Sequence, residues 1–492
     1  PHSATHLPPP QGGQYGIKTM KRLAYLLAIA FAPLLAQAQQ SDLVNDSIAA
    51  EAQMHINKFA DSPGLEYASL GICVRDIATG EEIASHDPDL AVCTASTMKA
   101  ITASTALELL GPNYRFHTTV RLDGEVTDSI LVGNIVIIGG GDPTLGTRHD
   151  NNRGSLPKAI ADSVKALGIK AIKGKILTDE SLIKGCPVNP RWQVEDLPTD
   201  YAPGVHAINY RDNIVSLRIN KAGACSLQPN IDMRVENHTT RGERDVEMVL
   251  GLGDKPVLSV YGTLNGPLNE QVANPNPAAL LVREVKDALQ QQDIAVIGDS
   301  LMPTEGKTIV DFQSDMLREI LHTLLLKSDN MYTDAVLRAI ARAKGNECSF
   351  KGGVKTVKDY WSNRGLPMDA LFMYDGSGLS RNNKCTASLM TQILHTVNAD
   401  STAIGMKLST IMTRLGEDGN IGNSMAIKAC KLKGRIASKS GSMADVQCYT
   451  GYFPYDNPRY SWAILVNNYN MKRATLKNRI DALLAKLFTT LK

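Results

Sequence analysis

Three short groups of residues combine a serine hydroxyl with a lysine or an amide, which are the groups that covalent catalysis requires. They are Ser96-Thr97-Met98-Lys99, Ser328-Asp329-Asn330 and Lys439-Ser440-Gly441, in this order along the chain. Each group alone is weak evidence, because such short patterns recur by chance in a chain of 492 residues. Together and in this order, they indicate an enzyme whose serine attacks a carbonyl group and carries a covalent acyl intermediate.

The first group places a serine three residues before a lysine. The sequence that follows is rich in alanine and helical to about Leu110, so Ser96 lies at or near a helix start. Positions i and i+3 of a helix share one face, and Lys99 can therefore reach the Ser96 hydroxyl. A lysine can act as the base if burial and a second cation, for which Lys439 is the candidate, depress its pKa. The helix N-terminus favours the negative charge that develops.

The second group follows a predicted helix end. In an extended turn, Ser328 and Asn330 point to the same side. We expect Ser328 to carry a proton between Lys99 and the leaving amine. Asn330 is expected to hold Lys99 and the substrate amide. Asp329 points elsewhere in such a turn and is expected to have a structural role.

The third group lies at the end of a predicted strand and is followed by Ser442. A cation at Lys439 suits the terminal carboxylate of a peptide substrate. The hydroxyls of Ser440 and Ser442, on either side of Gly441, can bind the same carboxylate. The backbone N–H groups of Ser96 and Ser442 would form an oxyanion hole, in which each donor often contributes about 3 kcal/mol.

The N-terminal sequence predicts export. Residues 1–19 are interpreted as a linker or as sequence upstream of the true start, because the pattern changes at Met20. Residues 20–38 then have the three parts of a secretory signal peptide: a basic Lys21-Arg22, an apolar run from Leu23 to Leu35, and the small-residue cleavage site Ala36-Gln37-Ala38. The apolar run is too short to span about 30 Å of hydrocarbon. We therefore expect a cleaved, exported, periplasmic protein with at most peripheral membrane contact.

Composition narrows the class of ligand. A formal net charge of +2 disfavours nucleic acid, since phosphate binding usually leaves a strong basic excess. The ten histidines are scattered without metal-ligand spacing, and the eight cysteines include no C-x-x-C pair. We expect no metal and no cofactor. Disulfide bridges and free thiols both remain open, and the pairing cannot be deduced from the sequence.

The predicted secondary structure changes in character twice along the sequence. Residues 41–104 combine a helical pattern, a hairpin and the Ser96 helix, and residues 308–492 are mainly helical with three strands before a last amphipathic helix. Between them, short β-rich runs alternate with glycine-rich turns. This pattern predicts one α/β (α+β) domain that is interrupted by a large, mostly β insertion.

Further segments carry a family resemblance. They are Gly140-Gly141-Asp142-Pro143-Thr144-Leu145, the stretch from Tyr201-Ala202-Pro203 to Asp212-Asn213, and the loop Asp375-Gly376-Ser377-Gly378-Leu379-Ser380-Arg381-Asn382-Asn383. With the three catalytic groups, they make the mature chain similar to the class C low-molecular-mass penicillin-binding proteins, serine D-Ala-D-Ala carboxypeptidases and endopeptidases with large inserted domains. We interpret Asp375, Ser377 and Arg381 as structural residues of a turn near the site.

The resemblance implies a fold and a domain organisation. The fold is a penicillin-binding/β-lactamase-like transpeptidase domain with an antiparallel sheet and flanking helices, interrupted by a mostly β two-domain insertion. The implied boundaries are 41–104 and 308–492 for catalytic domain I, 105–213 and 265–307 for domain II, and 214–264 for a nested domain III.

The resemblance also implies a reaction. Ser96 would attack the penultimate D-Ala carbonyl of a peptidoglycan stem peptide, water would then release the acyl group, and β-lactams would acylate the same serine. Asp179 aligns with a family aspartate that meets a substrate amino group, although its neighbour Glu180 departs from the family pattern.

Other classes remain as alternatives. A β-lactamase shares the chemistry, but the long insertion disfavours it. A non-catalytic β-lactam sensor or wall-binding protein is disfavoured by the intact catalytic groups, and a serine esterase by the absence of a tyrosine from the second group. The sequence does not separate carboxypeptidase from endopeptidase preference, and it gives neither the third stem residue nor the oligomeric state.

Overall fold

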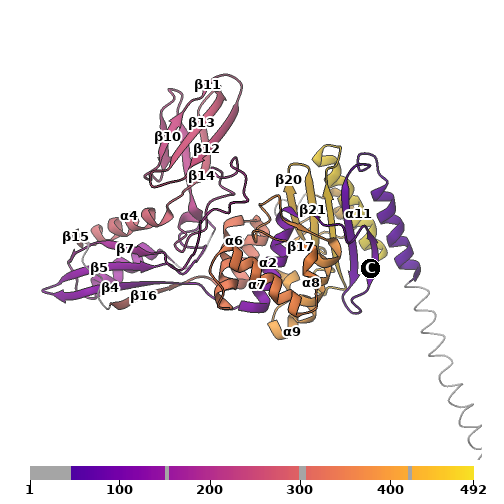
Figure 1. The fold of residues 1–492 in the computed structure, drawn as a ribbon, viewed down its shortest axis with the longest axis horizontal. Coiled ribbons are helices and arrows are strands. Elements are labelled where there is room, and N and C mark those ends of the chain that lie inside the picture. Colours follow the sequence, from indigo (N-terminus) through magenta and orange to yellow (C-terminus); the bar gives the residue numbers. More distant parts are fainter. Residues whose placement is uncertain (1–45, 150–153, 299–305, 419–420, 422–423) are drawn as a thin grey trace, which may run out of the picture.

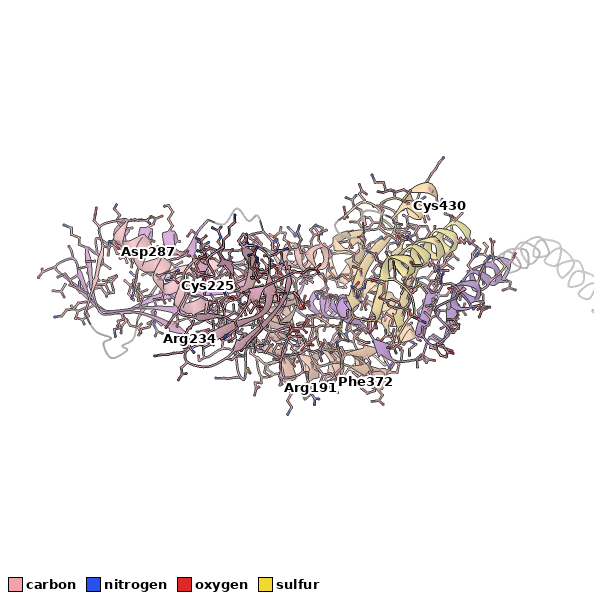
Figure 2. All side chains as sticks on the ribbon, turned by 90° about the horizontal axis from the view of Figure 1, so that it is seen from above. Arg191, Cys225, Arg234, Asp287, Phe372 and Cys430 are labelled. Carbon is pink, nitrogen blue, oxygen red and sulfur yellow. The ribbon has the colours of Figure 1, made fainter. Side chains whose placement is uncertain are left out.

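The molecule is elongated because a large middle part of the sequence folds away from the rest (Figure 1). The computed structural model describes residues 46–149, 154–298, 306–418, 421 and 424–492. In Figure 1, the right-hand half contains the elements up to α2 (Met98–Leu110) and those from α5 (Leu317–Lys327) onward. The elements between them extend to the left and upward. In Figure 2, Cys225, Arg234 and Asp287 lie in the inserted part, and Phe372 and Cys430 in the other half.

A six-stranded sheet forms the centre of the right-hand half, with the strand order β19-β20-β21-β22-β1-β2 and every neighbouring pair antiparallel. Its strands are β19 (Thr413–Arg414), β20 (Ala437–Met443), β21 (Val446–Phe453), β22 (Tyr460–Asn467), β1 (Ser69–Asp76) and β2 (Glu82–His86). All side chains of β21 and β22 are buried. Because helices cover both faces of these strands, they are expected to lack the alternation of apolar and polar residues that is typical of a surface strand.

Helices on the two faces of this sheet enclose two separate cores. On one face, α11 (Arg473–Thr490) packs Phe488 against Phe453 and Trp462. The helix over residues 46–60 contributes to the same core. On the other face lies the larger core, which contains α2, α6 (Asn330–Ala343), α7 (Phe350–Asn363) and α8 (Ala387–Ala399). Nearly all of α2 is buried, as expected of a helix that is enclosed on every side.

The inserted part begins with a long hairpin. Strands β4 (His117–Thr127) and β5 (Ile130–Ile138) form nine antiparallel pairs, and only Asp128 and Ser129 connect them, both with positive φ. A two-residue turn of this hand matches the twist of the strands. Four further strands complete a six-stranded mixed sheet. Three of them pair in parallel, β6 (Ala171–Lys173), β7 (Ile176–Asp179) and β15 (Ala295–Ile297), and the fourth, β16 (Lys307–Gln313), pairs antiparallel with β4.

Two capped helices form a core with this sheet. Ser155 caps α3 (Leu156–Ala166), and Asn276 caps α4 (Pro277–Gln290), each by accepting a backbone N–H with its side-chain oxygen. Both helices have proline in the first turn, where the missing N–H has no helical partner to lose. Their apolar faces belong to a core of their own, distinct from the cores of the other half.

A further pair of sheets forms the part at the top of Figure 1, with its own small core. The first sheet pairs β14 (Leu268–Ala273), β8 (Ile214–Ile219) and β9 (Cys225–Gln228), and the second pairs β10 (Arg234–Asn237), β13 (Val257–Leu264), β11 (Thr240–Arg241) and β12 (Asp245–Gly251). The register of β8 on β14 sets Ile214 opposite Ala273, so the chain enters and leaves this part side by side.

The return from the insertion differs in detail from the sequence expectation. Strand β16 pairs with β4 from Gln313 opposite His117 to Lys307 opposite Leu122. It therefore belongs to the inserted sheet, whereas the sequence suggested that the second catalytic segment begins at residue 308. The Phe116 N–H donates to the Ser314 hydroxyl at 2.8 Å, which marks the point where the two connecting strands reach the catalytic half.

The predicted signal peptide, residues 20–38, and the preceding residues 1–19 lie outside the described residues. Within the described part of the chain, no helix is long and apolar enough to cross a membrane. All eight cysteines are described and carry free thiols.

Candidate active site

Ser96 lies where β3 (Val92–Cys93) passes into the buried α2. It occupies a 3₁₀ turn, Ala95–Thr97, directly before the helix, so its backbone N–H is at a helix N-terminus as the sequence predicts. The turn is tight, because Ala95 has a φ of 44° and the Thr97 N–H donates to the Thr94 carbonyl at 3.2 Å. The Ser96 side chain is half-buried and faces a cavity.

Lys99 is fully buried and has three partners. Its Nζ lies 3.2 Å from Ser96 Oγ, 2.5 Å from Asn330 Oδ1 and 2.6 Å from the Ser377 carbonyl oxygen. A neutral amine has two hydrogens and one lone pair. Both hydrogens can therefore go to the two oxygens, and the lone pair is left for the Ser96 hydroxyl. Burial lowers the pKa of Lys99 to about 8, although the negative charge of Asp334 opposes this shift.

The second group lies in the junction between α5 and α6. Ser328 is the C-cap of α5 with a left-handed conformation, φ 58° and ψ 38°. Asp329 is the N-cap of α6 and accepts from the Tyr332 N–H at 2.9 Å, which is a structural role. The amide of Asn330 is held from both ends, since its Nδ2 donates to the Tyr201 carbonyl at 2.8 Å while its Oδ1 accepts from Lys99.

Lys439 connects the third group to the second. Its Nζ donates to Ser328 Oγ at 3.0 Å, and the side chain is 1% exposed. Burial and the nearby charge of Lys99 lower the pKa of Lys439 well below its usual value. Two residues along β20, Gly441 approaches Ser96 so closely that a Cβ at this position would lie 2.8 Å from the Ser96 nitrogen. Strand β20 therefore packs directly on the helix start.

The loop of residues 375–383 forms another side of the site. Both carboxylate oxygens of Asp375 accept hydrogen bonds, at 2.7–2.9 Å. The donors to Oδ1 are Gly378 N–H and Asn383 Nδ2, and the donors to Oδ2 are Ser380 N–H and Trp192 Nε1. Gly378 has a φ of +80°, and a Cβ there would lie 1.9 Å from the Ala95 carbonyl oxygen. The glycine-rich loop thus holds the residue before Ser96 in place.

A cavity of about 370 Å³ opens in front of Ser96. Its lining residues come from the catalytic groups, from the segment 193–201 and from the 379–381 loop: Ser96, Gln193, Asp196, Tyr201, Ser328, Asn330, Leu379, Arg381, Ser442, Met443 and Ala444. Two charged side chains are held by neighbours in the wall. The Tyr201 hydroxyl donates to Asp196 Oδ1 at 2.8 Å, and Arg381 Nε donates to Gln193 Oε1 at 2.5 Å. Burial raises the pKa of Asp196.

The structure brings most of the predicted site residues together. Ser96, Lys99 and Asn330 form one hydrogen-bonded group, and Ser328 and Lys439 form a second. Ser442 lies in the cavity wall and Gly441 packs against Ser96. Ser440 and Asp179 are not among the lining residues. Asp179 ends β7 in the inserted sheet, where the side chain of Ser181 and then its N–H, which donates to Asp179 Oδ1 at 2.9 Å, lower the pKa of Asp179.

Sequence reasoning missed Asp196 and Gln193 as wall residues and treated Arg381 as structural. Nothing in the local sequence distinguishes Asp196 from Glu195 or Asp200. Its position depends on Trp192, which anchors the segment by the bond to Asp375 across 183 residues of sequence. Among the described residues, no cluster of histidine, cysteine and acidic side chains is arranged to hold a metal ion.

A serine beside a buried lysine at a helix start, a Ser-x-Asn turn and a Lys-Ser-Gly strand next to the serine define the class of penicillin-recognising serine acyltransferases. Within that class, the chain belongs to the D-Ala-D-Ala carboxypeptidase 3 (S13) family, whose sequence model matches residues 52–487. It is a serine-type D-Ala-D-Ala carboxypeptidase, as the resemblance predicted.

Relatives match most of the chain. The D-alanyl-D-alanine carboxypeptidase of Actinomadura sp. strain R39 is 27% identical over 494 residues, covering 93% of this chain and 88% of that protein. The D-alanyl-D-alanine carboxypeptidase DacB of Haemophilus influenzae is 25% identical over 408 residues, covering 79% and 82%. The crystal structure of penicillin binding protein 4 from H. influenzae superposes with a TM-score of 0.75 at 21% identity, covering 89% and 99%. This likeness confirms the mixed α/β fold with inserted β sheets.

Proposed function

We propose that Ser96 is the acylated nucleophile and that Lys99 is its base. The observation that carries this proposal is the position of Lys99 Nζ, which has two oxygens at 2.5 and 2.6 Å and the Ser96 hydroxyl at 3.2 Å. When Lys99 is neutral, its lone pair accepts the Ser96 proton as Oγ bonds to the substrate carbonyl carbon. The same two oxygens then hold the ammonium that results.

Collapse of the tetrahedral intermediate requires a proton on the leaving amine. Ser328 donates its hydroxyl hydrogen to that amine as the C–N bond breaks, and the proton that Lys99 took from Ser96 then passes to Ser328, which leaves Lys99 neutral again. The Lys439 amine, 3.0 Å away, holds the Ser328 hydroxyl in place during this transfer. Water then attacks the acyl carbonyl carbon while Lys99 accepts one of its protons, and Lys99 passes that proton to Ser96 Oγ as the ester bond to Ser96 breaks. The backbone N–H groups of Ser96 and Ser442 stabilise the oxyanion, which the close packing of Gly441 on Ser96 supports.

The terminal carboxylate of the substrate binds beside Lys439 and Ser442. In the empty cavity, burial favours the neutral amine of Lys439. A substrate carboxylate places a negative charge next to this amine, and that charge favours the ammonium form. Binding of a D-Ala carboxylate is thereby coupled to the charge that Lys439 needs.

Charged groups of the stem peptide are bound by Asp196 and Arg381, which line the cavity from opposite segments of the chain. The carboxylate of Asp196 suits a substrate ammonium, and the guanidinium of Arg381 suits a carboxylate. Asp179 remains a weaker candidate for binding a substrate amino group, because it does not line the cavity. In a cross-linked stem, the D-Ala carbonyl is bonded to an amino group of the neighbouring stem instead of to a terminal D-Ala. Attack on the same carbonyl then cuts the cross-link, so we expect endopeptidase activity together with carboxypeptidase activity.

The same site accounts for further expected properties. β-Lactams resemble acyl-D-Ala-D-Ala and acylate Ser96. The related H. influenzae protein has a crystal structure in complex with a β-lactam, which supports this expectation. Peptidoglycan stem peptides are the substrates, no cofactor is required, and the protein acts in the periplasm after removal of residues 20–38.

Digestion of purified muropeptides tests the activity. We expect a disaccharide pentapeptide to lose its terminal D-Ala, and a D-Ala-cross-linked dimer to be split into monomers, with neither product formed by Ser96→Ala. An unchanged pentapeptide in the presence of folded wild-type protein would contradict the proposal. Cleavage of benzylpenicillin with turnover, but not of muropeptides, would favour a β-lactamase instead.

A further inference from the structure

One turn of α6 beyond Asn330 lies a carboxyl group that the mechanism above does not use. Asp334 is completely buried. Residues four apart on a helix share a face. Asn330 therefore faces Lys99 with its amide, while Asp334 faces the segment that supplies the other oxygen bound to Lys99.

Asp334 binds that segment directly. Its Oδ1 accepts from the backbone N–H groups of Gly376 at 2.6 Å and Ser377 at 3.2 Å. From the opposite side, the Thr102 hydroxyl on α2 donates to the Gly376 carbonyl at 2.8 Å. The next carbonyl along, that of Ser377, accepts from Lys99 Nζ at 2.6 Å. Two helices thus clamp one peptide segment so that the Ser377 carbonyl points at the amine.

The clamp leaves no spare room at Gly376. A Cβ at that position would lie 3.1 Å from Thr102 Oγ1 and 3.2 Å from Asp334 Oδ1, closer than almost all real contacts of this kind. The loop is therefore seated on these two side chains, and a change in either of them is transmitted to the Ser377 carbonyl.

Asp334 also brings a buried carboxyl group to this arrangement. Its second oxygen, Oδ2, has no hydrogen-bond partner among the residues that the structure describes. Burial and the charge of Asp375 raise the pKa of Asp334 to about 7, and in turn the charge of Asp334 raises the pKa of Lys99 against the effect of burial. A buried carboxyl and a buried amine of this kind titrate as a pair.

Few charged groups face Asp334. They are Lys99 from α2, Asp375 from the loop and Arg338, one turn further along α6. The buried residues of the neighbouring helices α5 and α7 are all uncharged, mostly aliphatic or aromatic. Lys99 has the charges of Asp329 and Lys439 near it as well, so a small set of groups controls its protonation state.

We propose that Asp334 is a positioning residue for Lys99: its carboxylate fixes the Ser377 carbonyl against the amine and supplies the buried negative charge that offsets the desolvation of that amine. The inference rests on the proposed role of Lys99 as the base of Ser96. Asp334 itself does not line the cavity, so it acts on the proton transfer and not on substrate binding.

The pH dependence of Ser96 acylation by benzylpenicillin separates the two effects. Asp334→Asn keeps an oxygen for the two N–H groups and removes the charge, so we expect the acidic limb of the rate profile to move about one unit toward lower pH. Asp334→Ala removes the clamp as well and lowers the maximal rate about 10- to 100-fold, because small misplacements of catalytic groups are costly. Asparagine should restore most of that loss.

Thr102→Val is the matched control. It releases the same loop from the other side without changing a charge, so we expect a lower rate with an unmoved pH limb. The KM for a pentapeptide substrate should stay within about twofold in all three variants, since none of them changes the cavity wall, and the loss should fall on kcat.

An unmoved limb in folded Asp334→Asn would overturn the inference. So would fast exchange of the Gly376 and Ser377 amide hydrogens in the wild-type protein, a measurement that does not depend on whether any variant folds. Both results leave the proposed function standing if the wild-type protein is acylated. Absence of acylation in the wild-type protein would instead overturn the proposed function on which the inference rests.

Discussion

At the scale of single residues, the site depends on two lysines that are kept out of water. Lys99 is 0% and Lys439 is 1% exposed, yet each has oxygen partners for its hydrogens. Burying an amine without such partners would cost several kcal/mol, whereas here burial mainly favours the neutral form. The serine is thereby activated by a base whose pKa is shifted towards neutrality rather than by a histidine.

The first prediction concerns the pH at which this base works. With a pKa of about 8 for Lys99, about a tenth of the amine is neutral at pH 7, compared with roughly 0.03% for a lysine at its usual pKa. The required form is the neutral one, so the acylation rate should rise with pH up to about 8 and then level off. Stopped-flow acylation across pH 5–10 measures this limb.

Lys99→Met serves as the control for that profile. Removal of the base should lower the acylation rate by about 10²- to 10⁴-fold and abolish the limb. A profile that is flat in the wild-type protein between pH 6 and 9 would show that Lys99 is not the titrating base.

At the scale of elements, catalysis depends on three backbone segments that meet at Ser96. The turn before α2, strand β20 and the loop of residues 375–383 come together through glycines, because Gly441 and Gly378 have no room for a side chain. The hydrogen bonds of Asp375 and the capping by Asp329 fix the ends of the same elements. Precise placement of Ser96 is therefore a property of packing rather than of one bond.

Gly378→Ala tests this packing against a matched position. Both Gly378 and Gly365 have a φ near +80°, but only at Gly378 does an added Cβ meet another atom, the Ala95 carbonyl oxygen at 1.9 Å. We expect Gly365→Ala to cost only about 1–2 kcal/mol of left-handed strain, with normal acylation. Gly378→Ala should lose at least about 1–3 kcal/mol more and most of its acylation rate. Urea unfolding and acylation assays give both quantities.

The sequence predicted the catalytic elements well for a physical reason. Ser96 to Lys99 is a local pattern whose geometry follows from the helix, and the structural role expected of Asp329 is also local, because Asp329 caps α6. Asp196 and Asp334 could not be assigned in the same way, because their partners lie far away in the chain. Asp196 depends on the anchoring of Trp192 to Asp375, and Asp334 binds a loop 42 residues away.

At the scale of the whole molecule, the described residues contain four hydrophobic cores, of which two belong to the inserted part. The sequence predicted a mostly β insertion, and the likeness to penicillin binding protein 4 confirms that fold class. The sequence alone could not assign β16 to the inserted sheet, because this assignment depends on the pairing of β16 with β4 across nearly two hundred residues and not on local composition.

Separate cores predict separable stability. Leu258 is completely buried in the small core of the two sheets at the top of Figure 1, and no residue of that core lines the cavity. Leu258→Ala should destabilise these sheets by about 2–5 kcal/mol and increase their amide exchange, while benzylpenicillin acylation stays normal. Leu321→Ala, equally buried in the catalytic core, should instead increase exchange around α5. Slower acylation in Leu258→Ala, or increased exchange around α5 in that variant, would show that the cores are not independent.

The central claim is that Ser96 is the acylated residue, and mass spectrometry of the protein after incubation with benzylpenicillin tests it most directly. The account predicts one stable adduct per chain, located in the proteolytic peptide that contains Ser96, lost in Ser96→Ala and retained in Ser440→Ala, whose side chain does not line the cavity. An adduct that persists in Ser96→Ala, or no adduct with penicillin left intact, would contradict it.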